Sequence, residues 1–193
     1  YLRLFHRQDR LNQVKTVFTI HNVAYQGIFP RERISKMGLD FQQYLQAGLE
    51  YYNQINLLKG GIVNADALTT VSPQYASEIQ TKTFGSGLDG VLRSRIDGLT
   101  GILNGVDYAY WNPSSDPLID HHYSADDPDN KRRNKAALQE LCGFEVNDKI
   151  PLFGFVGRLA QQKGLDLLAA AMENLSRLNL QIVVQGVGEQ KYQ

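Results

Sequence analysis

Short β-rich runs alternate with longer helical stretches along this chain, and this alternation limits the possible folds more than any other feature. Five runs are rich in β-branched or aromatic side chains, as buried parallel strands are. They are Lys15–Ile20, Ala67–Val71, Thr100–Leu103, Leu152–Val156 and Leu180–Gln185. Helical candidates lie between them, at Tyr52–Asn64, Pro73–Gln80, Lys131–Leu141 and Leu165–Leu175. The pattern predicts an α/β protein with parallel sheets flanked by helices.

The stretch from Asn104 to Asp129 interrupts this alternation. It holds three prolines and many Asp, Asn and Ser residues, with little apolar periodicity. Such a composition is typical of a linker. We therefore place a domain boundary near Asn112, with residues 1–112 as the later part of one α/β domain and residues 113–193 as the beginning of a second.

Composition argues against several classes of protein. Twenty basic and twenty acidic residues cancel, so no overall field draws the chain to nucleic acid or to a membrane. The hydrophobic share of 42% suits a globular chain, and no apolar run approaches the ~18 residues of a membrane span. The single Cys142 cannot form a disulfide within the chain, which favours a reducing compartment.

Polar or glycine residues follow each predicted strand. In open α/β sheets, ligands bind beyond the carboxyl ends of the strands, so these exits are the place to look for a site. Each exit alone is weak evidence because turns are polar anyway, but the feature recurs across both predicted domains. The exits are His21-Asn22, Ser72-Pro73, Asn104-Gly105, Gly157-Arg158 and Gly186-x-Gly188.

The stretch FVGRLAQQKGLD, from Phe155 to Asp166, is the most informative exit. Gly157 ends a strand, Arg158 follows, and Lys163 comes where a helix should begin. Helix N-termini attract anions, and two added cations would form a phosphate clamp. Such a clamp would stabilise a departing nucleoside diphosphate without a metal. The alternative is a pair of solvated cations in a loop, but the flanking glycines and the strand exit favour the clamp.

His21 comes directly after the first predicted strand, and Asn22 and the turn Tyr25-Gln26-Gly27 follow it. A histidine here is more often a structural hydrogen-bonding group than a catalyst. In a functional role it would hold a sugar hydroxyl, since no Ser-His-Asp or Cys-His arrangement supports a nucleophile. The glycine-dense loop Phe84–Gly90 is either a segment that approaches a ligand closely or a plain flexible turn.

Five blocks of this sequence, in order over nearly the whole chain, resemble bacterial glycogen synthases and plant starch synthases. The blocks are TVFTIHNVAYQGIFP (Thr16–Pro30), KGGIVNADALTTVSPQYASEI (Lys59–Ile79), GLDGVL (Gly87–Leu92), GILNGVDYAYWNP (Gly101–Pro113) and VGRLAQQKGLDLL (Val156–Leu168). The resemblance implies part of a two-domain GT-B glycosyltransferase with twin Rossmann-like domains. The earlier domain would lie on the acceptor side, and the later one would bind the nucleotide sugar.

The resemblance also implies a reaction of glycogen or starch biosynthesis. Glucose would pass from ADP-glucose to the non-reducing end of an α-1,4-glucan with retention of configuration, without a metal or other cofactor. The family positions matched by Arg158 and Lys163 hold the donor diphosphate, and the one matched by His21 lies near the donor glucose. These three are our catalytic candidates. The substrate-binding candidates are Asn22, Gly27, Asn104, Gly157, Arg158 and Lys163.

Two functional elements of the family, a Lys-x-Gly-Gly loop and a late Glu, lie outside this sequence. We therefore expect the complete protein to be an active enzyme. This piece alone should be inactive and poorly soluble. The expected setting is the bacterial cytoplasm, with a plastid as the alternative. Neither nucleic acid nor membrane is an expected partner.

Two other functions stay open on the sequence. The first is another GT-B glycosyltransferase, such as a sucrose synthase or an enzyme that acts on small acceptors. The second is a catalytically dead paralogue that binds glucan or nucleotide.

The segment Asp126-Asp127-Pro128-Asp129 holds an Asp-x-Asp pattern, which binds a divalent metal in some glycosyltransferases. We favour a helix start instead, with Asp127 as N-cap and Pro128 at the first helical position. The basic run that follows then reads as a solvated helix face, and we predict no metal site here.

Overall fold

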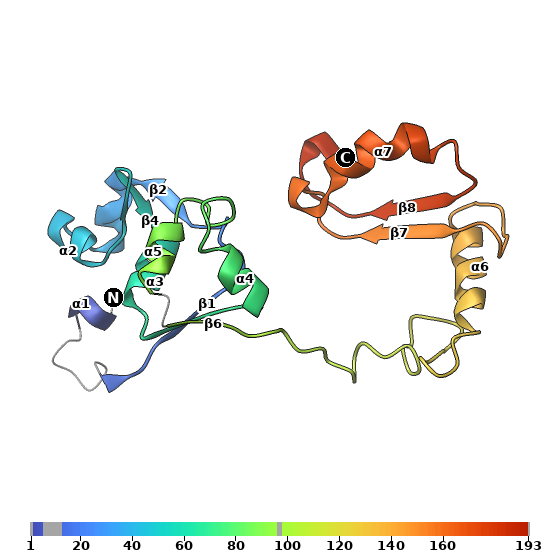
Figure 1. Cartoon of the computed structure of the whole chain (residues 1–193), viewed down its shortest axis with the longest axis horizontal. Coiled ribbons are helices and arrows are strands. Elements are labelled where there is room, and N and C mark those ends of the chain that lie inside the picture. Colours follow the sequence, from blue (N-terminus) through green and yellow to red (C-terminus); the bar gives the residue numbers. More distant parts are fainter. Residues whose placement is uncertain (1, 6–12, 96–97, 193) are drawn as a thin grey trace. The chain divides into compact units, whose positions relative to one another are not determined.

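The computed structural model describes residues 2–5, 13–95 and 98–192. The chain divides into two compact units, residues 1–105 and 106–193 (Figure 1). The division falls inside the predicted linker, and the finer assignment of residues 1–112 and 113–193 to two domains stays a prediction. Within the described residues, none of the helices combines the length and the apolar character that crossing a membrane requires.

A parallel sheet forms the centre of the first unit. Its strands are β1 (Val17–Ile20), β5 (Ala67–Thr70) and β6 (Leu99–Gly101), in the order β1-β5-β6. Ile20 pairs with Thr70, which pairs in turn with Gly101, so all three strands end at the same edge. These are three of the predicted strands, and their parallel arrangement is confirmed.

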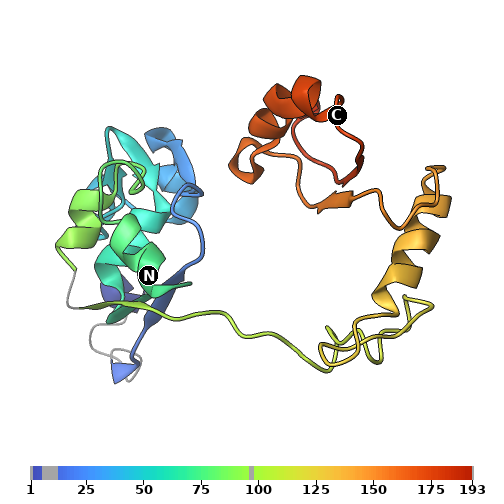
Figure 2. The same cartoon turned by 45° about the vertical axis from the view of Figure 1, so that its right-hand side comes forward.

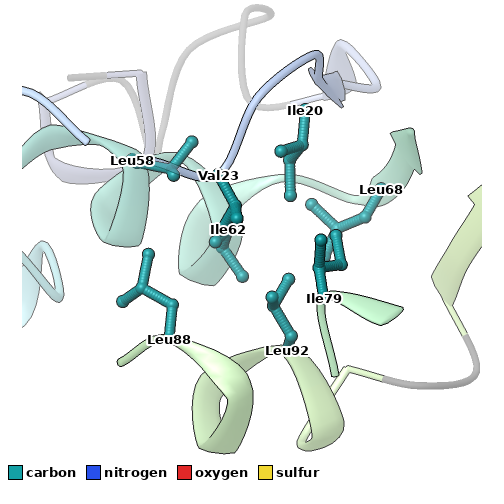
Figure 3. Close-up of a cluster of buried hydrophobic side chains, with 8 residues drawn as sticks. All are labelled: Ile20, Val23, Leu58, Ile62, Leu68, Ile79, Leu88 and Leu92. Carbon is teal, nitrogen blue, oxygen red and sulfur yellow. The ribbon is translucent and has the colours of Figure 1, made fainter. Parts of the chain in front are cut away.

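Helices α3 (Leu57–Asn64), α4 (Pro73–Glu78) and α5 (Asp89–Arg93) pack with this sheet. Eight buried apolar side chains join them to it, and Figure 3 shows those of α5 pointing toward those of α3 and the strands. They are Ile20, Val23, Leu58, Ile62, Leu68, Ile79, Leu88 and Leu92. Arg95 closes the far end of α3, where its guanidinium donates to the carbonyls of Ile62 and Ala65 at 2.8 and 2.6 Å.

A small antiparallel sheet lies between β1 and β5 in the sequence. It consists of β2 (Ile28–Pro30), β3 (Glu50–Tyr51) and β4 (Gln54–Asn56), in the order β2-β4-β3. The remaining elements of this unit are α1 (Leu2–Phe5), the 3-10 helix η2 (Arg31–Met37) and α2 (Phe41–Gln46). The buried Tyr44 of α2 donates its hydroxyl to the Gln54 carbonyl at 2.7 Å, which holds α2 against the sheet.

The predicted helix Tyr52–Asn64 is wrong in its first part. Tyr52 and Asn53 turn the chain at φ angles of 46° and 64°, and β4 follows them. The helix begins only at Leu57, because the Asn56 side chain accepts the N–H of Lys59 at 2.9 Å and so acts as the N-cap. The spacing of apolar residues that predicted the helix continues through the hairpin. It therefore does not show where the turn ends and the helix begins.

The second unit holds a parallel pair of strands, with one helix over a face and another beside the start of the strands (Figure 1). Strands β7 (Leu152–Val156) and β8 (Gln181–Gln185) pair over their full length. Helix α7 (Leu165–Leu175) covers one face (Figures 1 and 2), where it lines an apolar hollow together with Phe153, Phe155 and Ile182. Helix α6 (Lys131–Leu141) lines another hollow with Leu152. The 3-10 helices η4 (Gln161–Lys163) and η5 (Gln190–Tyr192) complete the unit.

A buried glutamine joins α6 to this pair of strands. Gln139 donates to the Asn147 carbonyl at 3.1 Å and to the side chain of Gln181, at the start of β8, at 2.6 Å. Buried amides cost free energy unless they are hydrogen-bonded, so this pairing fixes the helix in place.

The predicted N-cap at Asp127 is wrong, because α6 begins at Lys131 and Asn130 occupies the cap position. The carbonyls of Asp127 and Pro128 accept the N–H groups of Ser124 and Lys131, so they belong to a turn that precedes the helix. Asn130 itself makes no side-chain cap, since its amide donates to the His122 carbonyl at 3.0 Å instead.

We expect Gly101→Ala to lower the free energy of unfolding by about 1–3 kcal/mol, because the added methyl group would overlap the backbone of Ser72 and Pro73. Gly98→Ala is the matched control, since no described residue beyond its chain neighbours lies within 4 Å of its added carbon. It should change the free energy of unfolding by less than about 1 kcal/mol. Urea unfolding followed by circular dichroism measures both, and equal losses would contradict the packing explanation.

Candidate functional site

The exit of β1 carries the first two candidate residues. His21 is exposed directly after the strand, and Asn22 is half-buried. The Asn22 side chain accepts the N–H of Ala24 at 3.0 Å and so shapes its own turn. The N–H of Val23 donates to the Tyr75 hydroxyl at 3.0 Å, which ties the loop to α4. The loop that presents His21 is therefore fixed by two hydrogen bonds of the residues that follow Asn22.

Gly27 ends the same loop in a conformation that favours glycine. Its φ is 61°, and an added Cβ would lie 3.3 Å from the Leu57 side chain. Its carbonyl accepts the N–H of Leu57 at 3.2 Å, and the Gln26 carbonyl accepts that of Leu58 at 3.0 Å. Both acceptors bind the first turn of α3, so Gly27 joins the loop to the start of that helix.

The exits of β5 and β6 lie at the same sheet edge, with β5 in the middle. Ser72 accepts the N–H of Tyr75 at 2.9 Å and caps α4. Gly101 packs so closely on Ser72 that a side chain would not fit. The N–H of Ile102 extends the pairing by donating to the Thr70 carbonyl at 2.8 Å. The exposed Asn104 follows, separated from His21 by the β5 exit.

The glycine-dense loop Phe84–Gly90 is anchored rather than freely flexible. Leu88 is fully buried in the core. The Ser86 carbonyl accepts a 2.8 Å hydrogen bond from the Gln26 side chain and a long one, 3.5 Å, from the Tyr51 hydroxyl. Burial, followed by the neighbouring Tyr52 and Asp89, raises the pKa of Tyr51 above its ordinary value, so the hydroxyl stays protonated and can donate.

In the second unit, the exits of β7 and β8 lie side by side. Gly157 donates to the Gln185 carbonyl at 3.0 Å, and Leu159 donates to the Val187 carbonyl at 3.0 Å. Added side chains at Gly186 and Gly188 would overlap the carbonyl oxygens of Gly157 and Leu159. The two glycines are therefore explained by backbone packing, which needs no nucleotide. The two exits enclose an open hollow of about 740 Å³, and Arg158 lines it.

Lys163 lies at the end of η4, exposed like Arg158. Gly164 follows with φ 74°, and α7 begins at Leu165; among the described residues no side chain caps this start. Lys163 lines the apolar hollow of about 410 Å³ below α7, whereas Arg158 lines the hollow at the strand exits. Both cations thus lie in the loop from β7 to α7 but border different hollows, and their clamp stays a prediction.

Buried residues on either side of Lys163 fix this loop. Leu159, Ala160 and Leu165 are 6%, 8% and 6% exposed. They anchor the backbone, while Arg158 and Lys163 point into accessible space. The loop therefore presents two cations from a well-anchored backbone.

Two buried polar residues beside the first exit, Gln26 and Asn56, were not among the predicted candidates; they are 7% and 0% exposed. For Asn56 a signal was available, because an Asn that comes directly before an apolar helical run is a typical N-cap. For Gln26 no local pattern indicates burial.

Comparison with known proteins identifies the family that this chain resembles. A family model described as the starch synthase catalytic domain matches residues 1–94. Glycogen synthase of Thermodesulfovibrio yellowstonii is 44% identical over all of this chain and 39% of its own length. Glycogen synthase 2 of Nitrosococcus oceani is 51% identical over 92% of this chain and 36% of its own length.

A solved structure extends the likeness to the fold. It is the catalytic domain of Starch Synthase IV from Arabidopsis thaliana, bound to ADP and acarbose. It matches with a TM-score of 0.88 and 32% identity over 99% of this chain and 40% of that one. This chain spans about two fifths of the length of these relatives. It belongs to the family of glycogen and starch synthases, glycosyltransferases of the GT-B fold.

Proposed function

We propose that the complete protein transfers glucose from ADP-glucose to the non-reducing end of an α-1,4-glucan, with retention of configuration. The observation that carries this proposal is the anchored loop between β7 and α7, with its two exposed cations, in a chain that matches glycogen synthases over its whole length. The ADP in the related Arabidopsis structure supports an adenine nucleotide as donor. Glycogen or starch is the proposed acceptor.

In this proposal the second unit binds the donor diphosphate. When the bond from glucose C1 to the diphosphate breaks, negative charge grows on the departing oxygen. Arg158 offers a planar fork and Lys163 a point charge, and the uncapped start of α7 adds a partial positive charge. Gly157 lets the backbone approach the ligand closely. Fixed cations of this kind stabilise the transition state more than the ground state, where less charge has developed.

The first unit would hold sugar. His21 is exposed at the β1 exit and suits a hydrogen bond to a hydroxyl of the donor glucose, while Asn104 provides a further polar contact. Asn22 and Gly27 would serve the substrate by shaping the loop that presents His21. No residue in this scheme acts as a nucleophile.

We also propose that the reaction needs neither a metal nor another cofactor, because the charge of the leaving group is met by side chains. The relatives at 44–51% identity are bacterial, which supports the bacterial cytoplasm over a plastid as the setting. Neither nucleic acid nor membrane has a part in the proposed activity.

We expect Lys163→Ala in the complete protein to lower glucose incorporation into glycogen by roughly 10- to 1000-fold, because the departing diphosphate loses a cation. ADP-glucose and UDP-glucose are supplied separately, and ADP-glucose should be the better donor. Arg177→Ala is the matched control: Arg177 is also exposed, but it follows the opposite end of α7 and pairs with Glu173 at 2.7 Å. Its loss should change the rate less than about twofold.

Three outcomes of this assay are informative. An unchanged rate in Lys163→Ala would remove our role for Lys163 but keep the reaction. A folded, unmodified protein that uses neither donor would contradict the proposed function. That result would favour a small acceptor or a paralogue that only binds.

A chelator should leave the rate unchanged. We compare untreated enzyme with enzyme that has been dialysed against excess EDTA and assayed in its presence. Both should incorporate glucose from ADP-glucose at the same rate, since Arg158 and Lys163 supply the positive charge. A loss of activity that Mg²⁺ or Mn²⁺ restores would contradict the metal-free scheme. The Lys163→Ala variant, assayed alongside, shows whether added metal compensates for the missing cation.

A further inference from the structure

One buried side chain connects three segments that are far apart in the sequence. Gln26 is 7% exposed and lies in the loop after β1. Its amide nitrogen donates to the Ser86 carbonyl at 2.8 Å, in the loop before α5. Its amide oxygen accepts from the Asn56 side chain at 2.6 Å, at the N-cap of α3. Gln26 therefore bridges the His21 loop, the start of α3 and the Ser86 loop.

The hydrogen bonds from Ser86 through Gln26 and Asn56 to Lys59 form a series. The backbone groups at its two ends fix which atom donates and which accepts in every bond of the series. The Ser86 group is a carbonyl and must accept, so the Gln26 nitrogen faces it. At the other end the Lys59 N–H must donate, so the Asn56 oxygen faces it at 2.9 Å. The Asn56 nitrogen is then left to donate and the Gln26 oxygen to accept, and these two atoms face each other. Reversing either amide would set donor against donor or acceptor against acceptor.

The Ser86 loop needs such support because its backbone is strained. Ser86 has φ 50°, a conformation that residues other than glycine seldom adopt, and Gly87 follows at φ 81°. Such conformations cost roughly 1–3 kcal/mol and persist only where the surroundings enforce them. The Tyr51 hydroxyl lies against Gly87 closely enough to exclude a side chain there. Gln26 thus holds in place a turn that would otherwise relax.

We propose that Gln26 is a positioning residue for glucosyl transfer, which keeps the Ser86 loop and the loop that bears His21 in one fixed arrangement. This inference rests on the proposed function, in which His21 contacts the donor glucose. Gln26 touches no substrate in this scheme and acts through the two loops. Misplacing a contact by about 1 Å can cost on the order of 100-fold in rate, so the turnover number is the sensitive quantity.

Two variants of the complete protein test this role. Gln26→Leu removes both hydrogen bonds at similar size. Gln26→Glu keeps an acceptor for Asn56, but its ionised carboxylate cannot donate to Ser86, so it breaks the link between the loops and adds a negative charge there. Asn64→Ala is the control: Asn64 ends α3, and its side chain donates to the carbonyls of Ala47 and Gly60, both at 2.7 Å, away from the strand exits.

The measurements are kcat and KM for ADP-glucose at a temperature where circular dichroism shows all variants folded, together with Tm. We expect both Gln26 variants to lower kcat roughly 10- to 100-fold with a smaller change in KM. Asn64→Ala should lower Tm but keep kcat within about twofold. Unchanged kcat in the Gln26 variants would overturn the proposal. An equal loss of kcat in Asn64→Ala would also overturn it, because lost stability would then explain both.

Hydrogen exchange separates this inference from the proposed function. The amides of Gly85 and Leu88, which donate to the carbonyls of Thr81 and Gly85 at 2.8 and 2.9 Å, should be protected in the unmodified protein. They should exchange faster in Gln26→Glu, whether or not the protein transfers glucose. Equal exchange in the unmodified protein and in Gln26→Glu would overturn the coupling of the loops. This comparison does not depend on whether Gln26→Leu folds. An unmodified protein that shows the coupling but no transfer would instead contradict the proposed function and, with it, the catalytic role of Gln26.

Discussion

Contact between backbones at the carboxyl ends of the parallel strands is the constraint on which the rest of this structure depends. Gly101 packs on Ser72 in the first unit, and Gly186 and Gly188 pack on Gly157 and Leu159 in the second. In each place a single methyl group would force neighbouring exits apart. Candidate site residues follow these exits directly, so the packing that closes the sheets also sets where the polar side chains begin.

The two units hold their loops with different chemistry. In the first, hydrogen bonds dominate: Asn22, Gln26, Asn56 and Ser72 each accept a backbone N–H or link to a side chain that does. In the second, burial of apolar residues around Arg158 and Lys163 fixes the loop. Polar anchoring suits a wall that contacts sugar hydroxyls. In the proposed scheme, apolar anchoring fixes the backbone of the loop that would present its cations to the diphosphate.

Local pattern was enough to predict the regular elements of the second unit. The ranges of β7, α6 and α7 agree with the structure, because each is a continuous run between clear breaks. It was not enough for the small antiparallel sheet, whose strands of two or three residues are too short to show a period, and where β2 pairs with β4 far along the sequence. The cap at Asp127 was misplaced for a different reason: Asp127 and Pro128 belong to a turn before the helix, and Asn130 follows them at the cap position.

The candidate site was predictable in part. Strand exits and family resemblance identified His21, Asn104, Arg158 and Lys163, and the structure places all four at or just beyond an exit or a helix start. The support beneath them was not predictable. Gln26 looks like any turn residue in the sequence, and its burial depends on Ser86 and Asn56, which come together only in the fold.

The parallel pairing of β1 with β5 has a consequence for how the first unit folds. Thr19 and Thr69, whose hydroxyls lie 2.7 Å apart, are separated by fifty positions in the chain. Closing so long a loop is entropically costly, and contacts of high sequence separation slow folding. The antiparallel sheet and the link from Gln26 to Asn56 draw the ends of this excursion together through shorter closures. Once the insert has formed, the closure that remains between β1 and β5 is shorter than the fifty positions of the sequence, and its entropic cost is lower.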